Sequence, residues 1–455
     1  MNQHNLPIAS LFDEETQRRA YAIAANQECL ASTGEFYAQS PFSRPSRPQD
    51  LPHFLHQAMS ESENLPPSLA LFGHRLLFTG YEQELVFLPQ KTSSQMKSYR
   101  SFYDSEARAA AAIIRPALEK KLFGWMDREI ELSGKWTLNA FREYSEGVLE
   151  DLEKSESTFL RLLHELNDKK SAVQFFIVQC ASDFLCEASA MARNVLGNYG
   201  PELSELFKIL IDEYGYGVHE KKHSTLFEEL MQDAELNPMP HYYWQFYNTG
   251  SLSLANYFQF ISGDHNQFFR YLGALYFTEA SLAFITRHQS AAIKLAFGKD
   301  ANTLYFDEHT HIDTHHGRMA FENLIVPIVE KCGVGVLGEI VKGFEEFRTL
   351  LDRADEEMLA QIAWLDKASK ADGAPAGTES DETMVFTEEE GELSVTHCHD
   401  LDEWFEVEKG TIDLVCSPFK RVRLEAGEGM VLPKGMLHGS IVVSDSCTYR
   451  VAPVA

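Results

Sequence analysis

Asp307-Glu-His-Thr-His-Ile-Asp-Thr-His-His-Gly317 is the stretch that decides how the middle of the chain is interpreted. Within it, His309, Asp313 and His316 are separated by four and three residues. At about 100° per residue on an α-helix, the three side chains fall within roughly 60° of one another. Two imidazoles and a carboxylate on one helical stripe can bind a metal ion.

The other histidines of this stretch, His311 and His315, fall on the opposite side of such a helix. The alternative interpretation is therefore a solvated, histidine-rich helix face. Acidic residues elsewhere in the chain decide between the two.

Residues 131–365 are predicted to form an all-helical bundle, because apolar residues recur there at spacings of three and four and strand signals are nearly absent. Residues 1–130 are also mostly helical in pattern, and we expect them to form a helical dimerisation or support domain. Within the bundle region, the periodicity predicts helices over 137–166, 172–196, 201–214, 222–234, 267–287 and 318–352.

Several acidic residues of this predicted bundle stand in stretches that are otherwise apolar. Glu187 and Glu279 stand in strongly apolar sequence, Glu213 precedes Tyr-Gly-Tyr-Gly, and His223 follows ten residues after Glu213. A carboxylate in apolar company lies either on a thin polar stripe or is buried with a partner, and a metal ion is one such partner. Carboxylates and imidazoles on facing helices predict a di-iron or di-manganese centre in the bundle core.

The order of these residues resembles that of the haem-oxygenase-like di-iron oxidases. The resemblance implies the fold of haem oxygenase with two irons in place of haem, and activation of dioxygen for N-hydroxylation, desaturation or C–C cleavage. The matching positions are Glu187, His223, Glu279, His309, Asp313 and His316, with Glu213 as an extra carboxylate of some N-oxygenating members. Which residue binds which iron is left open.

A change of composition separates this region from the end of the chain. Residues 366–384 are small, polar and contain Gly and Pro, which predicts a linker. Residues 385–455 show short alternating strands with turns, as in a small β-barrel. The predicted fold class is therefore multidomain α + β, with a helical N-terminal module, an all-α bundle and a C-terminal β-barrel.

The barrel region fits both cupin motifs at every spacing. The motifs read Gly391-x5-His397-x-His399-x3-Glu403-x6-Gly410 and Gly427-x5-Pro433-x-Gly435-x2-His438. His397 and His399 alternate along one strand and therefore point to the same side. With His438 from a later strand they form a three-histidine set suited to iron(II) with open positions. Whether Glu403 is a fourth ligand is left open.

Tyr449 is a candidate catalytic residue in the last predicted strand. Cys447, Tyr449 and Val451 alternate there with Thr448 and Arg450, so one of the two sets faces the barrel interior. Ordinary packing in the barrel is the alternative role for Tyr449.

The composition limits the function classes. The formal charge of −28, from 68 acidic and 40 basic residues, argues against nucleic acid or an anionic membrane surface as the main partner. Seven cysteines without a C-x-x-C pair indicate a reducing compartment. With no signal-peptide pattern and no apolar run of the ~20 residues that a membrane span needs, we expect a cytoplasmic protein.

The combination of a di-iron domain and a cupin on one chain resembles the N-nitrosourea-forming metalloenzymes of streptozotocin biosynthesis. This resemblance implies that the di-iron domain hydroxylates the guanidine of Nω-methyl-L-arginine, or a close arginine derivative, with O2 and an external reductant. It implies that a cupin iron then rearranges the product oxidatively to an N-nitrosourea, and that the N-terminal helices hold a homodimer.

Two rival functions are kept. The first is a di-iron oxidase that acts on another amino acid or a fatty acid by N-oxygenation, desaturation or C–C cleavage. The second is a non-catalytic protein whose cupin binds a small effector and whose bundle holds no metal, a reading that metal content distinguishes.

Overall fold

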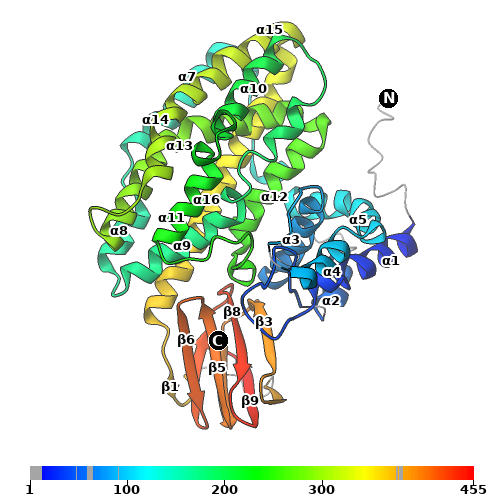
Figure 1. The fold of residues 1–455 in the computed structure, drawn as a ribbon, viewed down its shortest axis with the longest axis vertical. Coiled ribbons are helices and arrows are strands. Elements are labelled where there is room, and N and C mark those ends of the chain that lie inside the picture. Colours follow the sequence, from blue (N-terminus) through cyan, green and yellow to red (C-terminus); the bar gives the residue numbers. More distant parts are fainter. Residues whose placement is uncertain are drawn as a thin grey trace. The chain divides into compact units, whose positions relative to one another are not determined.

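The computed structural model describes residues 13–47, 49–58, 65–90, 92–375, 378 and 383–454. The chain folds into two compact units, each assembled from separate stretches of sequence (Figure 1). One unit comprises residues 1–125, 241–252 and 360–455, and the other comprises residues 126–240 and 253–359. Among the described residues, no helix combines the length and the apolar character that a membrane crossing requires.

The second unit is entirely helical in its regular structure. Its helices are α6 (Met126–Glu129), α7 (Leu138–Lys154), α8 (Thr158–Glu165), α9 (Lys169–Phe184), α10 (Pro201–Glu213), α11 (His223–Asp233), α12 (Thr249–Gly263), α13 (Phe268–Phe297), α14 (Leu304–Met319), α15 (Val326–Cys332) and α16 (Leu337–Lys367), of which α12 and α16 extend into the first unit. Side-chain caps start several of them: Thr137 accepts from the Ala140 amide, and Asp168 accepts from the Ser171 amide.

Small residues let the central helix α13 approach its neighbours closely. A Cβ on Gly273 would lie 1.8 Å from the Ile340 carbonyl oxygen of α16, and a Cβ on Gly317 of α14 would lie 2.8 Å from the Ala280 Cα. Neither position has room for a larger side chain. The backbones of α13 and α14 are therefore in contact where both helices carry candidate ligands.

Three of the predicted helices are interrupted. The helix expected over 137–166 is two helices, α7 and α8, and the helix expected over 318–352 is broken at Gly333, which has a φ of 89°. The prediction of one helix over 172–196 is also wrong, because α9 ends at Phe184 and irregular turns follow. Hydrophobic periodicity continues through these breaks, which is why the sequence does not reveal them.

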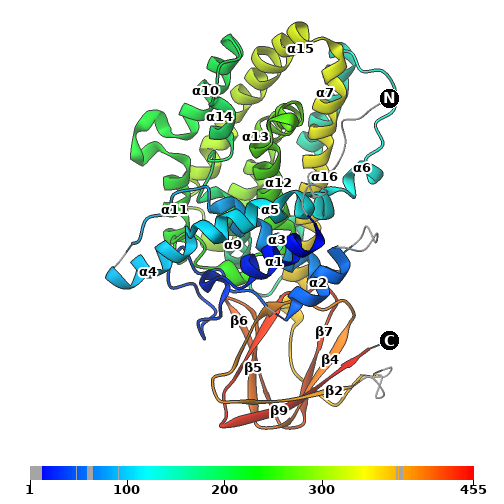
Figure 2. The ribbon, with the colours of Figure 1, turned by 90° about the vertical axis from the view of Figure 1, so that its right-hand side faces the viewer.

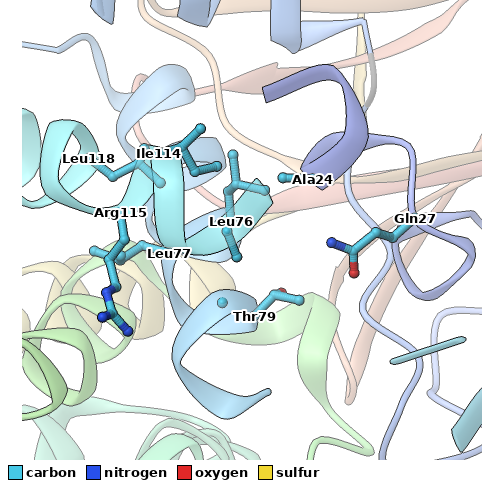
Figure 3. A pocket seen from close by; sticks show the side chains of 10 residues that line it. Ala24, Gln27, Leu76, Leu77, Thr79, Ile114, Arg115 and Leu118 are labelled. Carbon is cyan, nitrogen blue, oxygen red and sulfur yellow. The ribbon is translucent and has the colours of Figure 1, made fainter. Parts of the chain in front are cut away.

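The first unit contains the N-terminal helices and both β-sheets. Its helices are α1 (Glu14–Ala25), α2 (Asp50–Ala58), α3 (Pro67–Glu82), α4 (Thr92–Phe102) and α5 (Ser105–Phe123). A cavity of about 10 Å³ lies among α1, α3 and α5, lined by Leu76, Ile114 and Leu118 among others (Figure 3). That volume holds a single water molecule, so this cavity is no candidate for a substrate site.

Among the described residues, nine short strands build two antiparallel sheets that face each other (Figure 2). The strands are β1 (Ala371–Asp372), β2 (Met384–Glu389), β3 (Leu393–His397), β4 (Glu403–Lys409), β5 (Thr411–Ser417), β6 (Lys420–Glu425), β7 (Glu428–Leu432), β8 (His438–Val442) and β9 (Ser446–Pro453). Their orders are β1-β7-β4-β9-β2 and β3-β8-β5-β6. Val407, Leu414, Leu432 and Val451 fill the space between the sheets.

The predicted fold class, helical modules followed by a small β-barrel, is confirmed. The first part of the predicted linker 366–384 belongs to the end of α16 and to β1. Residues 376, 377 and 379–382 of that linker lie outside the described residues.

Candidate metal centres

Seven candidate ligands predicted in the bundle meet in two adjoining donor groups. In each group, one ligand atom per residue lies within 4.8 Å of the others. The groups are Glu187, Glu213, His223 and His309, and Glu213, Glu279, Asp313 and His316. Glu213 belongs to both, so one carboxylate lies between the two donor sets.

Helix α14 presents three of these donors from one face. His309, Asp313 and His316 are buried, whereas His311 and His315 are exposed, as the helical spacing predicts. The neighbouring helix α13 supplies Glu279, whose Oε2 lies 3.2 Å from Nδ1 of His316. The close approach of α13 and α14 at Gly317 brings these two side chains together.

The other donors come from places where helices end. Glu187 lies beyond the end of α9, next to Ala188, whose φ is 62°. Tyr305 donates a hydrogen bond to Glu187 over 2.9 Å. Glu213 is the last residue of α10 and His223 is the first of α11, with 2.6 Å between Oε2 of Glu213 and Nδ1 of His223. Glu213 and His223 come together because the chain turns back between α10 and α11, and not through a spacing along one helix.

The bundle site fits two divalent cations. Four carboxylates are gathered there, and both oxygens of Asp313 and Oε2 of Glu187 are buried without a hydrogen-bond partner among the described residues. Burying an unpaired carboxylate oxygen is costly, and a cation offsets the cost. Two divalent ions balance four negative charges, and oxygen donors mixed with imidazole suit iron or manganese.

The pKa shifts of these side chains point the same way. Burial raises the pKa of Asp313 well above its usual value, although His309 opposes this shift. Burial lowers the pKa of His316, but the hydrogen bond and charge of Glu279 outweigh it and raise that pKa to about 10. Protons are thus held between the carboxylates where bound cations would replace them.

Asp212 is a functional candidate that sequence reasoning missed. Its Oδ2 lies 3.0 Å from Nε2 of His316, while Glu213, Glu279 and Asp313 lie on the Nδ1 side of the ring. Asp212 therefore orients the His316 ring through the nitrogen that faces away from the other carboxylates, as carboxylates commonly do for metal-bound imidazoles. Its position directly before Glu213 is the only signal of this in the sequence.

A cavity of about 90 Å³ opens onto this site. The candidate ligands Glu187, Glu213, Glu279, His309 and Asp313 line one part of it. The remaining lining is mostly apolar, with Phe184, Met191, Phe258, Leu275 and Leu282. Asp183 and Thr278 are the polar lining residues outside the donor groups, and sequence reasoning identified neither.

The three cupin histidines form a further donor group. Nε2 of His399 lies 3.1 Å from Nε2 of His438, and the ring centroid of His397 lies 4.7 Å from that of His438. Nδ1 of His397 donates to the Val395 carbonyl and Nδ1 of His438 to the Met436 carbonyl, each over 2.9 Å. These bonds leave the Nε2 lone pairs for a metal ion.

Glu403 lies behind the histidines instead of among them. Its Oε2 is 3.0 Å from Nδ1 of His399, the ring nitrogen that faces away from His438. Glu403 is not part of the donor group. The geometry favours a carboxylate that orients His399 over a fourth ligand.

The electrostatics of the cupin site favour the neutral form of His397 and His438. Burial lowers the pKa of His397 well below its usual value, and the charge of Arg47 lowers it further. Burial and His399 lower the pKa of His438 to about 3. Neutral imidazole is the form that binds a metal ion, so this site fits one mononuclear metal.

Tyr449 lies in the core between the sheets. Its ring stacks on Phe405 at a centroid distance of 4.6 Å and on Phe386 at 5.4 Å. Its hydroxyl donates to Glu388 over 2.9 Å, and burial raises the pKa of this hydroxyl. The described partner of the hydroxyl is thus a carboxylate of β2, and a catalytic role for Tyr449 stays a prediction.

The chain is similar to a protein family, to a curated protein and to a solved structure. Residues 174–349 match the family described as "Iron-containing redox enzyme". Over 424 residues the chain is 42% identical to the nitrosourea synthase of Streptomyces achromogenes subsp. streptozoticus, covering 91% of this chain and 90% of that protein. A crystal structure of a cupin-2 domain-containing protein from Shewanella frigidimarina NCIMB 400 matches 18% of this chain and 76% of that chain, with 25% identity and a TM-score of 0.15.

Proposed function

From its membership of the nitrosourea synthase family, and as an iron-containing oxidoreductase, we propose that the chain performs two consecutive oxidations. The two oxidations take place at two separate centres. In the first, the bundle hydroxylates guanidine nitrogens of Nω-methyl-L-arginine or a close arginine derivative, using O2 and an external reductant. In the second, the cupin rearranges the hydroxylated guanidine oxidatively to an N-nitrosourea, with O2 as the oxidant. The first step belongs to residues 131–365 and the second to residues 385–455.

The single observation that carries the proposal is the pair of donor groups sharing Glu213. We assign two irons to these groups and one Fe(II) to His397, His399 and His438. Iron bound in this way supplies the redox chemistry with dioxygen that amino-acid side chains lack. The protein's own contribution is to hold the donors, bind the substrate and keep bulk water out.

Asp183 supports a cationic substrate. It lines the bundle cavity beside the donor groups, in an otherwise mostly apolar wall. A guanidinium is planar and recognises a carboxylate through two parallel hydrogen bonds. Asp183 thus offers a charged anchor, while Phe258, Leu275 and Leu282 exclude water from the reacting end.

At the cupin, the second-step residues have distinct tasks in this proposal. His397, His399 and His438 would hold the metal through Nε2, and Glu403, whose Oε2 lies 3.0 Å from Nδ1 of His399, would orient that ring. Three protein ligands leave coordination positions for the hydroxylated guanidine.

The homodimer implied by the family resemblance is part of the proposal, and sedimentation equilibrium of the full chain measures it.

The experiment separates the two steps by variant. His316→Ala removes a bundle donor, so N-hydroxylation of Nω-methyl-L-arginine is lost while pre-hydroxylated substrate is still converted. His397→Ala removes a cupin donor, so hydroxylated arginine accumulates without the nitroso product. Mass spectrometry of both reactions with iron and reductant measures these outcomes.

Any of three results overturns the proposal. Unchanged final product from both variants removes the assignment of the two centres. Turnover of a fatty acid or of an unrelated amino acid, with none of arginine derivatives, leaves an oxidase with another substrate. A chain that binds no iron in the bundle is the effector-binding protein instead.

A further inference from the structure

Strand β3 ends with His397, and its regular pairing with the neighbouring strand β8 is interrupted just before that histidine. It is the edge strand of its sheet, and its pairing with β8 shifts between Ser394 and His397. Thr396, directly before His397, is fully buried. A buried peptide group needs hydrogen-bond partners, so the partners of Thr396 come from outside the sheet.

Helix α3 and the segment 241–252 supply them. Arg75 of α3 donates to the Thr396 carbonyl over 2.7 Å and to its Oγ1 over 2.9 Å. The Thr396 amide donates to Oε1 of Gln245 over 3.1 Å, and Arg75 also donates to the Gln245 carbonyl over 3.1 Å. Arg75 is 2% exposed, so these bonds are shielded from water.

The same helix holds the other end of the ligand segment. Ser68, in the first turn of α3, donates from its amide and from its hydroxyl to the two carboxylate oxygens of Asp400, each over 3.0 Å. Asp400 directly follows His399. Ser68 and Arg75 are two helical turns apart, about 10 Å along the axis. Helix α3 is therefore bonded to both ends of the segment 396–400 that carries His397 and His399.

The chain on either side of His438, the third histidine, is also held by residues outside the strands. The side chain of Gln361 accepts from the Leu437 amide over 2.8 Å and donates to the Leu437 carbonyl over 2.9 Å. On the other side of His438, a Cβ on Gly439 would lie 2.6 Å from Cε1 of Phe36, so the two residues are in close contact. Each candidate cupin ligand thus has a chain neighbour held by residues that lie outside the strands.

We propose that helix α3 positions the cupin ligands, with Arg75 as the main positioning residue. This inference rests on the proposed cupin iron site and gives the N-terminal helices a task beyond dimerisation. Three imidazoles bind one metal only when they are held within about 0.5 Å of the required positions. Arg75 meets that need because its planar group donates to two chain segments at once in a fixed geometry, whereas the ammonium of a lysine is a rotatable point charge.

The test uses the full chain with three variants. Arg75→Met removes the donors and keeps a similar volume, and Arg75→Lys keeps the charge and serves as the milder change. Gln83→Met is the matched control, because Gln83 is also buried at the end of α3 but bonds to Phe102 and Gln27 within the helical module. Equilibrium binding of Fe(II) without oxygen is measured, with the electron paramagnetic resonance spectrum of the nitric oxide adduct reporting mononuclear iron.

We expect Arg75→Met to weaken mononuclear iron binding by about tenfold or more, the usual effect of losing a residue that orients metal ligands. Its spectrum should broaden, since the ligand geometry is no longer unique. Arg75→Lys should recover part of the affinity, and Gln83→Met should bind iron like the wild type. Unchanged affinity and spectrum in Arg75→Met, or equal losses in Gln83→Met, would overturn the proposal.

Hydrogen exchange of the metal-free chain separates this inference from the proposed function. Arg75→Met should accelerate exchange of residues 394–400 by about tenfold, and Gln83→Met should not. Accelerated exchange in a chain whose wild type binds no mononuclear iron would keep the positioning role and reject the cupin iron. Iron loss without faster exchange would reject the positioning role.

Discussion

Glu213 is the residue on which the bundle site depends, because it belongs to both donor groups. Burial raises its pKa, but the hydrogen bond with His223 and the charges of His309 and His316 outweigh burial and lower it. The carboxylate is therefore ionised, with one oxygen for each neighbouring donor group. At the cupin, Glu403 has the opposite task and acts on a ligand instead of on the metal.

Asp183 is predicted to select the cationic substrate. Asp183→Asn removes a charge-assisted hydrogen bond to guanidinium, worth about 1.5–3 kcal/mol, so KM for Nω-methyl-L-arginine should rise about tenfold or more. Iron content should not change, since Asp183 is outside the donor groups. Steady-state kinetics and iron analysis measure both.

Asp168→Asn is the matched control for that substitution. Asp168 caps the other end of the same helix, where asparagine is an equally good cap. Equal KM values in Asp183→Asn and wild type would show that the substrate cation is recognised elsewhere.

Glu403→Ala should weaken iron binding at the cupin by about 10- to 100-fold without removing a ligand. The reason is that His399 loses the carboxylate that lies 3.0 Å from its Nδ1 and orients the ring. Glu408→Ala, at an exposed position of the same strand, is the control. Fe(II) titration measures the difference, and identical affinities of the two variants would contradict the orienting role.

At the scale of elements, the sequence predicts what local spacing determines. His309, Asp313 and His316 lie on one helix and serve two adjoining donor groups, while the cupin histidines lie on the paired strands β3 and β8 or, for His399, just after the end of β3. The break that carries Glu187 is not predictable, because apolar periodicity runs through it. Asp212 and Asp183 gain their roles only through contacts between helices that are distant in sequence.

Gly317→Ala tests the close approach of α13 and α14. The added methyl group meets backbone of Ala280, so the helices must separate beside His316 and Glu279. We expect a loss of about 1–3 kcal/mol in unfolding free energy and less iron in the bundle. Urea denaturation and iron analysis measure these changes.

Gly147→Ala provides the comparison, because a Cβ there meets nothing within 4 Å in helix α7. Its helix should become more stable by about 0.5–1 kcal/mol. If Gly317→Ala behaves like Gly147→Ala and keeps its iron, the helices do not need to touch at this point.

At the scale of the whole molecule, one chain carries two chemically different sets of candidate metal ligands, carboxylates with histidines in the bundle and three histidines in the barrel. The sequence analysis predicts separate regions that follow one another along the chain, whereas in the structure residues 1–125 and 360–455 belong to one compact unit. Sequence patterns do not reveal this joining, because the bonds of Arg75 and Ser68 to the cupin connect residues more than 300 positions apart. The formal charge of −28 favours the approach of a cationic substrate.

The most direct test of the two-centre account is mass spectrometry of the iron-loaded chain reacting with Nω-methyl-L-arginine, reductant and ¹⁸O2. The account predicts hydroxylated arginine carrying ¹⁸O, followed by an N-nitroso product that retains the label. Absence of labelled product from a chain with both centres filled with iron would contradict it.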